Sequence, residues 1–376
     1  SPMKQRRRLT IRAVTTLEEF KGLAGAWETL LDRMPGHSMF LTWEWLYYWT
    51  LHYLGDSQLR ILLAFDEHET LVGIAPLYLR CTRKHAVIAV RELRLLGSEA
   101  VCSSYLDLIV QEQHKAVMLQ SLYHYLFGDA RDEWDLLTLS DLSAGSSTLD
   151  LWNKLVAETG KVGDVSMTSC CPVIRLPADL PTYRASLGRN RRYTIQRKTR
   201  CLQQAGRMQF TRATSPADVE IAFESVITLH QRRWSSRPGG GVFANEQTRR
   251  FHRDIVRVLS ERGRVRIDLL LLDDRAIAGV YGVLYQGVYY FYLPGFDPDI
   301  LPKASPGLLL LHRVIEQALG DGAQMVDLLQ GSQPYKLEWS TGLCRLVTSR
   351  CYNRSASGAA VTLLDGAKQA LKILLR

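Results

Sequence analysis

Residues 288–339 read VYYFYLPGFDPDILPKASPGLLLLHRVIEQALGDGAQMVDLLQGSQPYKLEW, and this stretch decides how we interpret the fold. An aromatic strand ends near Pro294, an irregular loop follows, and Ser305-Pro306-Gly307 predicts the start of a helix. Gly320 ends that helix, and a short apolar strand then carries Asp327. A strand, a loop, a helix start and a second strand thus form one unit, in which we place the candidate site.

The helix start is the first candidate for ligand binding. Ser305 is a residue type that caps helices, Pro306 suits the first helical position, and Gly307 leaves the backbone accessible. A helix N-terminus carries unpaired N–H groups and a positive dipole end, so it attracts anions. We predict that the loop 296–307 holds a pyrophosphate, although the same pattern also describes an ordinary capped helix. The predicted cofactor-binding residues are Leu293, Gly295, Lys303, Ser305 and Gly307.

The strand before this loop supplies the second part of the candidate site. Its aromatic side chains alternate between the two faces of the sheet, and we predict that Tyr292 contacts substrate. Proline cannot donate to a ladder, so Pro294-Gly295 predicts a break that splays two strands apart and frees backbone groups. Asp297 then places a carboxylate at the opening. The alternative is a core strand that is followed by an ordinary Asp-Pro turn.

Four side chains are candidates for proton transfer. Asp327 lies in an apolar strand, so it is either a hydrogen-bond anchor or a base with a raised pKa, and the similarly placed Asp135 favours the anchor. Tyr335 suits a proton donor to a leaving thiolate, and His230 suits a base. The predicted catalytic residues are Asp297, Tyr335, His230 and Asp327. The predicted substrate-binding residues are Tyr292, Arg191, Arg192, Gln330, Lys336 and Trp339.

The charge of the chain points to an anionic partner. The 376 residues carry a formal net charge of +9, and the pI is about 9.2, although a basic surface without a partner has the same composition. The densest basic segment is GRNRRYTIQRKTR at 188–200, and the basic region extends over 184–207. It predicts either a helix that binds a polyanion, such as tRNA or a phosphorylated acceptor, or a solvated linker helix.

Composition also excludes several classes of protein. There is no run of about 18 apolar residues, so we expect no membrane-spanning helix, and the basic start SPMKQRRRLT lacks the apolar core of a secretory signal. Seven cysteines without a CxxC pair favour a reduced, cytoplasmic compartment. The nine histidines show no metal-binding spacing, so we expect no metal cofactor.

Two segments of the chain repeat one pattern. LRILLAFDEHETLVGIAPL at 59–77 and VRIDLLLLDDRAIAGVYG at 265–282 both have an apolar strand, an acidic turn and a second strand. We therefore predict two copies of one α/β (α+β) unit, each a mixed, twisted sheet flanked by helices.

The predicted domains cover residues 9–165 and 166–350, and the second carries the site. A basic amphipathic helix is predicted at 358–376. This helix either packs on its own domain or contacts a membrane surface or a protein partner through residues 361–376.

The motifs GFDP, SPG and DLLxGxxxYK occur in this order between residues 295 and 336. Together with FLTWEWLYYW at 40–49, they resemble the GNAT-fold acetyltransferases of the CelD type, which are linked to cellulose and exopolysaccharide synthesis. The resemblance covers most of residues 38–342. The fold of that family is similar to that of the Fem peptidyltransferases, which use aminoacyl-tRNA, and RRYTIQRK at 191–198 resembles one of their elements.

This resemblance implies tandem GNAT-like folds and direct transfer of an acyl group from acyl-CoA, such as acetyl-CoA, to an amine or, less often, a hydroxyl. The acceptor would be a small molecule or related to the envelope or to exopolysaccharide. Backbone N–H groups near Leu293–Gly295 would stabilise the oxyanion. The alternatives are a Fem-like aminoacyl or peptidyl transferase and a non-catalytic scaffold of a polysaccharide synthesis complex. The usual Q/RxxGxG/A loop is absent, and Ala304–Gly307 occupies its place.

Overall fold

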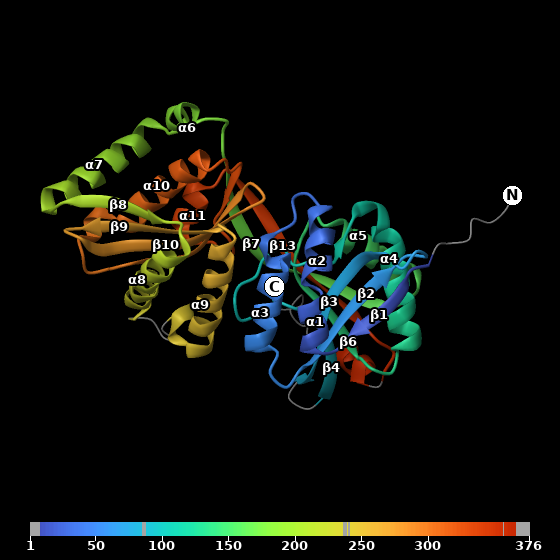
Figure 1. Cartoon of the computed structure of the whole chain (residues 1–376). Helices are drawn as coiled ribbons and strands as arrows, with labels where there is room; N and C mark the ends of the chain where they lie inside the picture. Colours follow the sequence, from blue (N-terminus) through green and yellow to red (C-terminus); the bar gives the residue numbers. More distant parts are fainter. Residues whose placement is uncertain (1–7, 85–87, 236–238, 240, 356, 366–376) are drawn as a thin grey trace. The chain divides into compact units, whose positions relative to one another are not determined.

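The computed structural model describes most of the chain. The described residues are 8–84, 88–235, 239, 241–355 and 357–365. The chain folds into two units, one made of residues 1–169 and 345–376 and the other of residues 170–344. Each unit has a mixed β-sheet flanked by helices (Figure 1), so the predicted α/β fold class is confirmed.

The first unit is built around antiparallel strands and a group of aromatic helices. Its strands are β1 (Thr10–Val14), β2 (Gln58–Phe65), β3 (Leu71–Lys84), β4 (Ile88–Leu95), β5 (Ile109–Val110) and β6 (Leu136–Ser143). Its helices are α1 (Leu17–Gly22), α2 (Ala24–Asp32), α3 (Trp43–Tyr53), α4 (Glu112–His124) and α5 (Ser147–Glu158), with the short turns η1 (Met39–Leu41) and η2 (Tyr125–Asp129). The buried ring of Phe20 in α1 packs on Trp27 of α2 and on Tyr47 of α3, which joins the three helices.

The second unit has the same kinds of element in a similar order. Its strands are β8 (Met208–Ala213), β9 (Val265–Leu272), β10 (Arg275–Tyr285), β11 (Val288–Phe296) and β12 (Met325–Asp327). Its helices are α6 (Leu180–Ser186), α7 (Arg189–Ala205), α8 (Pro216–Trp234), α9 (Glu246–Glu261), α10 (Pro306–Gly320) and α11 (Pro334–Trp339), with the turns η3 (Val242–Ala244) and η4 (Pro302–Ala304). Two long strands, β7 (Val162–Arg175) and β13 (Gly342–Tyr352), contribute residues to both units.

The two sheets have the same topology. Strands β1 to β4 are antiparallel neighbours, β4 is parallel to β6, and β6 is antiparallel to β13. In the second unit β8 to β11 are antiparallel neighbours, β11 is parallel to β12, and β12 is antiparallel to β7. The repeated segments at 59–77 and 265–282 therefore form equivalent hairpins, β2–β3 and β9–β10, which supports the predicted duplication.

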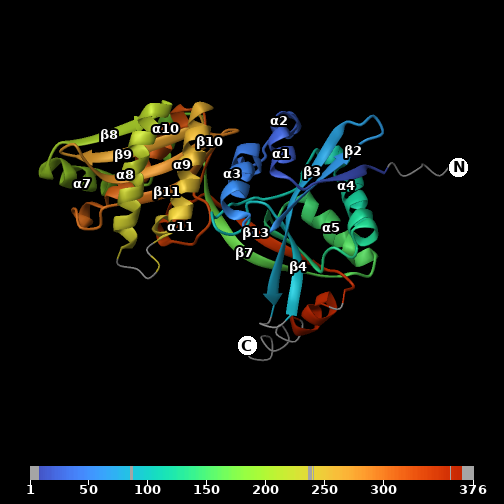
Figure 2. The same ribbon diagram turned by 60° about the horizontal axis from the view of Figure 1, so that its bottom comes forward.

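Helices cover both faces of the second sheet. Alternate residues of β10 divide between the faces: Tyr281 packs its ring against Phe223 of α8 and His252 of α9, whereas Val280 belongs to the core that includes Leu309 of α10. Figure 1 shows α7 and α10 on one side of β8–β11 and α8 and α9 on the other, and Figure 2 shows α8 beside α9. The open end of β11 lies between these two helical layers.

The predicted C-terminal helix is described in part. Residues 357–365 are helical, and Val361 is buried against Val90 and Tyr352 of the first unit. The described part of the helix therefore packs on the first unit, although in sequence it follows the second. The remaining residues of that helix, 366–376, lie outside the described residues, and the predicted membrane or partner contact falls mainly on them.

The packing of α8 on β11 depends on a glycine. A Cβ atom at Gly295 would lie 2.4 Å from the backbone nitrogen of His230 and 2.7 Å from the carbonyl carbon of Leu229. Backbone atoms of a helix cannot move aside as a flexible side chain can, so the absence of a side chain sets the distance between α8 and the sheet. Gly295 is therefore a packing residue, whatever else it does.

We expect Gly295→Ala to lower the free energy of unfolding by about 1–3 kcal/mol, because the added methyl group overpacks α8 against β11. Urea denaturation would measure the change. Gly320→Ala is the matched control, since nothing lies within 4 Å of a Cβ atom at that position. Equal stability of the Gly295→Ala variant and the unchanged protein would contradict the packing argument.

Candidate functional site

Strand β11 is open along part of one edge. It pairs with β12 through only three residues, Val288, Tyr289 and Tyr290, and β12 ends at Asp327. Strand β11 itself continues to Phe296. From Phe291 onward, no strand of the described chain pairs with this edge, so its backbone N–H and C=O groups can face a ligand.

The opening is real, but the predicted break at Pro294-Gly295 is wrong. The ladder between β10 and β11 continues through both residues to the pair Ala278–Phe296. The irregularity lies two residues earlier, because Tyr281 pairs with Leu293 and Gly282 pairs with Phe291, which leaves Tyr292 as a bulge. Proline removes only its own N–H donor, and the neighbouring pairs keep the register. The strands separate because β12 is short.

A cavity of about 460 Å³ lies at this open edge. Its walls come from the end of β11, the first turns of α10 and α11, with Gly279 of β10 and Arg233 of α8. Most of the wall is apolar, with side chains such as Phe291, Leu308 and Leu311. Six of the predicted site residues line it, namely Gly295, Asp297, Ser305, Gly307, Tyr335 and Trp339.

The N-terminus of α10 is uncapped on the cavity side. Ser305 occupies the predicted N-cap position, but it has left-handed backbone angles, with φ 49° and ψ 62°, and its side chain makes no capping hydrogen bond. Rather than capping the helix, the Oγ of Ser305 accepts a hydrogen bond of 2.6 Å from Nζ of Lys198 on α7. Pro306 has no N–H, so the first backbone N–H of the helix belongs to Gly307, which lines the cavity. An anionic group of a ligand can use this donor.

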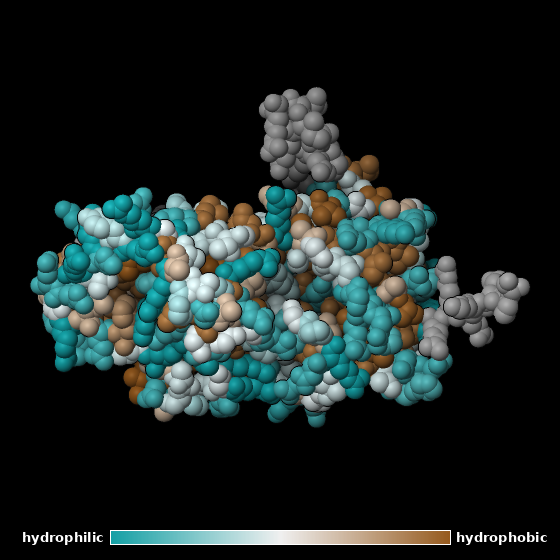
Figure 3. Space-filling model, turned by 90° about the horizontal axis from the view of Figure 1, so that it is seen from above, coloured by the Kyte–Doolittle hydropathy of each residue, from teal (hydrophilic) through white to brown (hydrophobic). Residues whose placement is uncertain are grey.

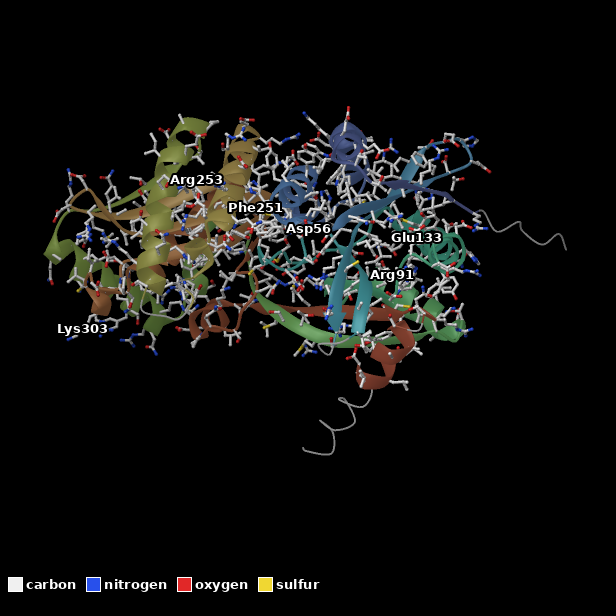
Figure 4. All side chains as sticks on the ribbon, turned by 90° about the horizontal axis from the view of Figure 1, so that it is seen from below. Asp56, Arg91, Glu133, Phe251, Arg253 and Lys303 are labelled. Atoms are coloured by element: carbon white, nitrogen blue, oxygen red, sulfur yellow. The ribbon has the colours of Figure 1, made fainter. Side chains whose placement is uncertain are left out.

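The cation at this helix start is Lys198 rather than Lys303. Nζ of Lys198 also lies 3.3 Å from the carbonyl oxygen of Lys303, so it bridges the turn before α10. Lys303 is exposed (Figure 4), and within the described chain its side chain forms no hydrogen bond to this helix start, whereas that of Lys198 does. The sequence contained a signal for Lys198 in the RRYTIQRK element, but nothing in that element tells which of its charges reaches α10.

Asp297 is an ion-paired carboxylate at the mouth of the cavity. Its Oδ2 lies 2.5 Å from Arg232 and 2.8 Å from Arg275, and its side chain is almost fully buried. Burial alone would raise the pKa of Asp297, but the backbone N–H of Asp299 and the two arginines outweigh it and hold the pKa below its usual range. A carboxylate held in this way fixes the loop after β11 and is a weak proton acceptor, so the geometry favours a structural role.

His230 lies behind the strand. It is 3% exposed on α8, its ring packs on Phe243 and Trp234, and it is not part of the cavity wall. Burial first, and the charge of Arg233 second, lower the pKa of His230 to about 4. The imidazole is therefore neutral at pH 7, and its backbone packs against Gly295.

Asp327 is the last residue of β12, and its side chain fixes the turn that follows the strand. Its carboxylate accepts a 2.7 Å hydrogen bond from the N–H of Leu329, which has a positive φ of 57°. Lys336 donates to the carbonyl oxygen of Gln330 at 2.8 Å and is 7% exposed. This network supports the anchor interpretation of Asp327. It also turns Lys336 toward backbone carbonyls, and neither Lys336 nor Gln330 is part of the cavity wall.

Tyr335 and Trp339 line the cavity from the two ends of α11. Burial raises the pKa of Tyr335, and Arg233 partly offsets this effect, so the phenol is protonated at neutral pH and can donate a proton. Trp339 is 4% exposed, and the guanidinium of Arg191 lies 4.6 Å from its ring centroid.

The other predicted residues lie elsewhere. The ring of Tyr292 packs on His252 and Tyr281, on the side of the sheet that α8 and α9 cover. Leu293 is part of the ladder but not of the cavity wall, and Arg192 is exposed on α7. The structure thus separates the predicted residues into those that line the cavity and those that do not.

Two classes of feature can be judged within the described part of the chain. No group of three or more His, Cys, Asp or Glu side chains there is arranged to hold a metal ion. No described helix has the length and the apolar character that crossing a membrane requires.

Comparison with known proteins identifies the fold of this site. Residues 189–337, which lie within the second unit, match the family described as Acetyltransferase (GNAT) domain. Among solved structures, FemX is 10% identical, with 90% of this chain and 96% of that chain covered and a TM-score of 0.57. L-PGS from Bacillus licheniformis is 11% identical, with 90% of this chain and 94% of that chain covered and a TM-score of 0.54.

A conserved protein of unknown function from Bacteroides thetaiotaomicron VPI-5482 is similar to the same extent. It is 9% identical, with 92% of this chain and 99% of that chain covered and a TM-score of 0.54. No curated protein matches the sequence. At these identities the likeness shows a shared fold over both units and says nothing further about substrate.

The pKa of His230 gives a testable pH dependence. Because the folded-state pKa is lowered from 6.5 to about 4, the unfolded state binds a proton more readily as the pH falls through this window. The free energy of unfolding should therefore decrease between pH 6.5 and pH 4 by up to about 3 kcal/mol through this residue.

The His230→Phe variant should lack this component. Urea denaturation at pH 7.0, 5.5 and 4.5 would compare the two proteins, and their difference removes the contribution of the other titrating groups. Parallel pH profiles would show that His230 is not buried in its neutral form.

Proposed function

We propose that the second unit is an acyltransferase that moves an acyl group from acyl-CoA to an amine, or less often a hydroxyl, by direct transfer. One observation carries this proposal. The uncapped start of α10, the open edge of β11 and the protonated phenol of Tyr335 all border one largely apolar cavity. These are the three features that a thioester donor with a phosphorylated handle requires.

The donor's diphosphate would bind at the start of α10. The N–H of Gly307 and the positive end of the helix dipole face this position, and Lys198 adds a cation beside Ser305. The apolar wall then suits the arm that leads to the thioester. The short Ala304–Gly307 segment would replace a longer glycine-rich loop in binding the diphosphate. Lys198 binds the Ser305 hydroxyl, so this hydroxyl does not occupy the helix N–H groups.

The transfer step follows from the groups at the open edge. The amine nitrogen of the acceptor attacks the thioester carbon, a C–N bond forms, and the C–S bond breaks. Backbone N–H groups of β11 beyond Tyr290 stabilise the oxyanion, and Tyr335 donates its proton to the leaving thiolate. The proton of the amine passes to water, because Asp297 is held by two arginines and His230 lies outside the cavity.

The acceptor that we propose is a small molecule or an envelope- or exopolysaccharide-related amine in the cytoplasm. This part rests on the resemblance of GFDP, SPG and DLLxGxxxYK to the CelD-type acetyltransferases. A non-catalytic scaffold remains the outcome if no donor binds.

A second candidate donor is aminoacyl-tRNA, and the surface of α7 favours it. Arg192 and Arg197 are exposed and take part in no ion pair within the described chain, and Tyr193 is 63% exposed between them. The side of the unit that carries α7 is largely hydrophilic (left in Figure 3). Exposed arginines with an aromatic side chain are typical of a surface that binds RNA. The ester of an aminoacyl-tRNA would react at the same open edge.

Isothermal titration of the full chain with coenzyme A tests the first proposal. We expect binding, and we expect Lys198→Met to weaken it about tenfold, since a charged hydrogen-bond donor is lost at the helix start. Lys303→Met should weaken binding less than twofold, because that side chain is exposed and makes no hydrogen bond to the start of α10 within the described chain. Lys154→Met in the first unit, which removes the same charge from an exposed position, is the control.

Two results would contradict these assignments. If Lys303→Met weakens binding and Lys198→Met does not, the sequence-based choice of cation was correct and the structural one is wrong. If coenzyme A does not bind at all, whereas full-length tRNA binds with strong salt dependence, the aminoacyl-tRNA proposal takes its place.

A further inference from the structure

A second cavity adjoins the first and has a different character. Its volume is about 420 Å³, and it lies between the start of α7, the first turn of α10 and the end of α11. Leu308 and Trp339 line both cavities, so these two side chains form the partition between them. A ligand in the first cavity therefore has an adjacent compartment into which it can extend.

The wall of the second cavity is polar where the first is apolar. Asn190 and Thr194 line it, and neither side chain forms a hydrogen bond within the described chain. Arg191 also lines it and donates a 2.8 Å hydrogen bond to the carbonyl oxygen of Glu338, which fixes its guanidinium over Trp339. An amide, a hydroxyl and a guanidinium around one space can bind several oxygen atoms of a ligand.

The charge balance of this region favours an anionic ligand. The first turn of α7 has no acidic residue but contains Arg189, Arg191 and Arg192. Cations at a helix N-terminus oppose the helix dipole, so this arrangement costs stability unless an anion offsets it. The one carboxylate on the cavity wall belongs to Glu338, whose nearest oxygen is 3.9 Å from Arg191 and whose side chain is 64% exposed.

The partition itself contains an unsatisfied donor. Trp339 is 4% exposed, and its indole N–H has no acceptor within the described chain. A buried N–H group without an acceptor is costly in a protein interior. A ligand oxygen that reaches the partition would supply that acceptor after a small movement of the ring.

We propose that the second cavity is a phosphate subsite for the adenosine end of the donor. This inference rests on the proposed transfer function. Coenzyme A carries a phosphate on the 3′ oxygen of its adenosine, and the acceptor end of tRNA carries a phosphodiester on its terminal adenosine. Both donors thus present the same chemistry, an adenosine-linked phosphate, beyond the part that reaches the reaction centre. Arg191 binds the phosphate, and Asn190 and Thr194 bind its remaining oxygens or the sugar.

Calorimetric titration with three probes distinguishes the sources. The probes are coenzyme A, dephospho-coenzyme A and the 5′-phosphorylated trinucleotide CCA. If the phosphate is that of coenzyme A, Arg191→Gln weakens coenzyme A binding about tenfold and dephospho-coenzyme A binding less than twofold. If it is the phosphodiester of tRNA, Arg191→Gln weakens the binding of CCA about tenfold.

Arg200→Gln is the matched variant. Arg200 is exposed and lies nine residues further along α7, which at 3.6 residues per turn is the opposite side of the helix. If Arg191→Gln and Arg200→Gln weaken the binding of each probe equally, the loss reflects surface charge alone, and the proposal is overturned. Thr194→Val provides a second test of the cavity that keeps Arg191 on Trp339, with an expected loss of about threefold for the same probe.

Failure of this inference differs from failure of the proposed function. Binding of coenzyme A by the unchanged protein, with no loss in Arg191→Gln or Thr194→Val, overturns only the subsite. Absence of binding for all three probes overturns both.

Discussion

The limited pairing of β11 with β12 is the constraint on which the site depends. Three residue pairs hold the two parallel strands together, and the remaining length of β11 is free on that edge. A full ladder would use the backbone groups of this edge within the sheet and leave no space for a ligand. The turn that ends β12 is correspondingly well fixed, by the carboxylate of Asp327 on one side and the ammonium of Lys336 on the other. These buried polar groups fix the turn after β12, and the edge of β11 beyond it therefore stays open.

Much of the fold and part of the site could be predicted from the sequence, because the signals are local. Proline and glycine mark the end of β11 and the start of α10, and the cavity brings together Gly295, Asp297, Ser305, Gly307, Tyr335 and Trp339 from one stretch of about 50 residues. The pattern of strand, acidic turn and strand can be read in both halves of the chain. Side chains in a strand alternate between the two faces of the sheet, so the pattern is visible in the sequence itself.

What the sequence could not supply are pairings between distant positions. Lys198 binds Ser305 across 107 positions, and Arg232 forms an ion pair with Asp297, which is 65 positions away. A serine before a proline reads as a helix cap, and only the tertiary contact shows that its hydroxyl is taken by a lysine. The opening of the sheet also depends on a distant segment. Pro294 suggested where β11 loses its neighbour, whereas the end of β12 at Asp327 determines this point.

Strand β13 contributes residues to both units, and this has a consequence for how the chain folds during synthesis. Strand β6 obtains its neighbour from residues 346–352 of β13, which are synthesised about 200 positions after it. Until then the first sheet ends in an unpaired edge, and such an edge invites wrong partners. The duplicated halves are therefore similar in plan but not separable at the repeat boundary. Folding of the half that is translated first reaches completion only when nearly all of the second half has left the ribosome.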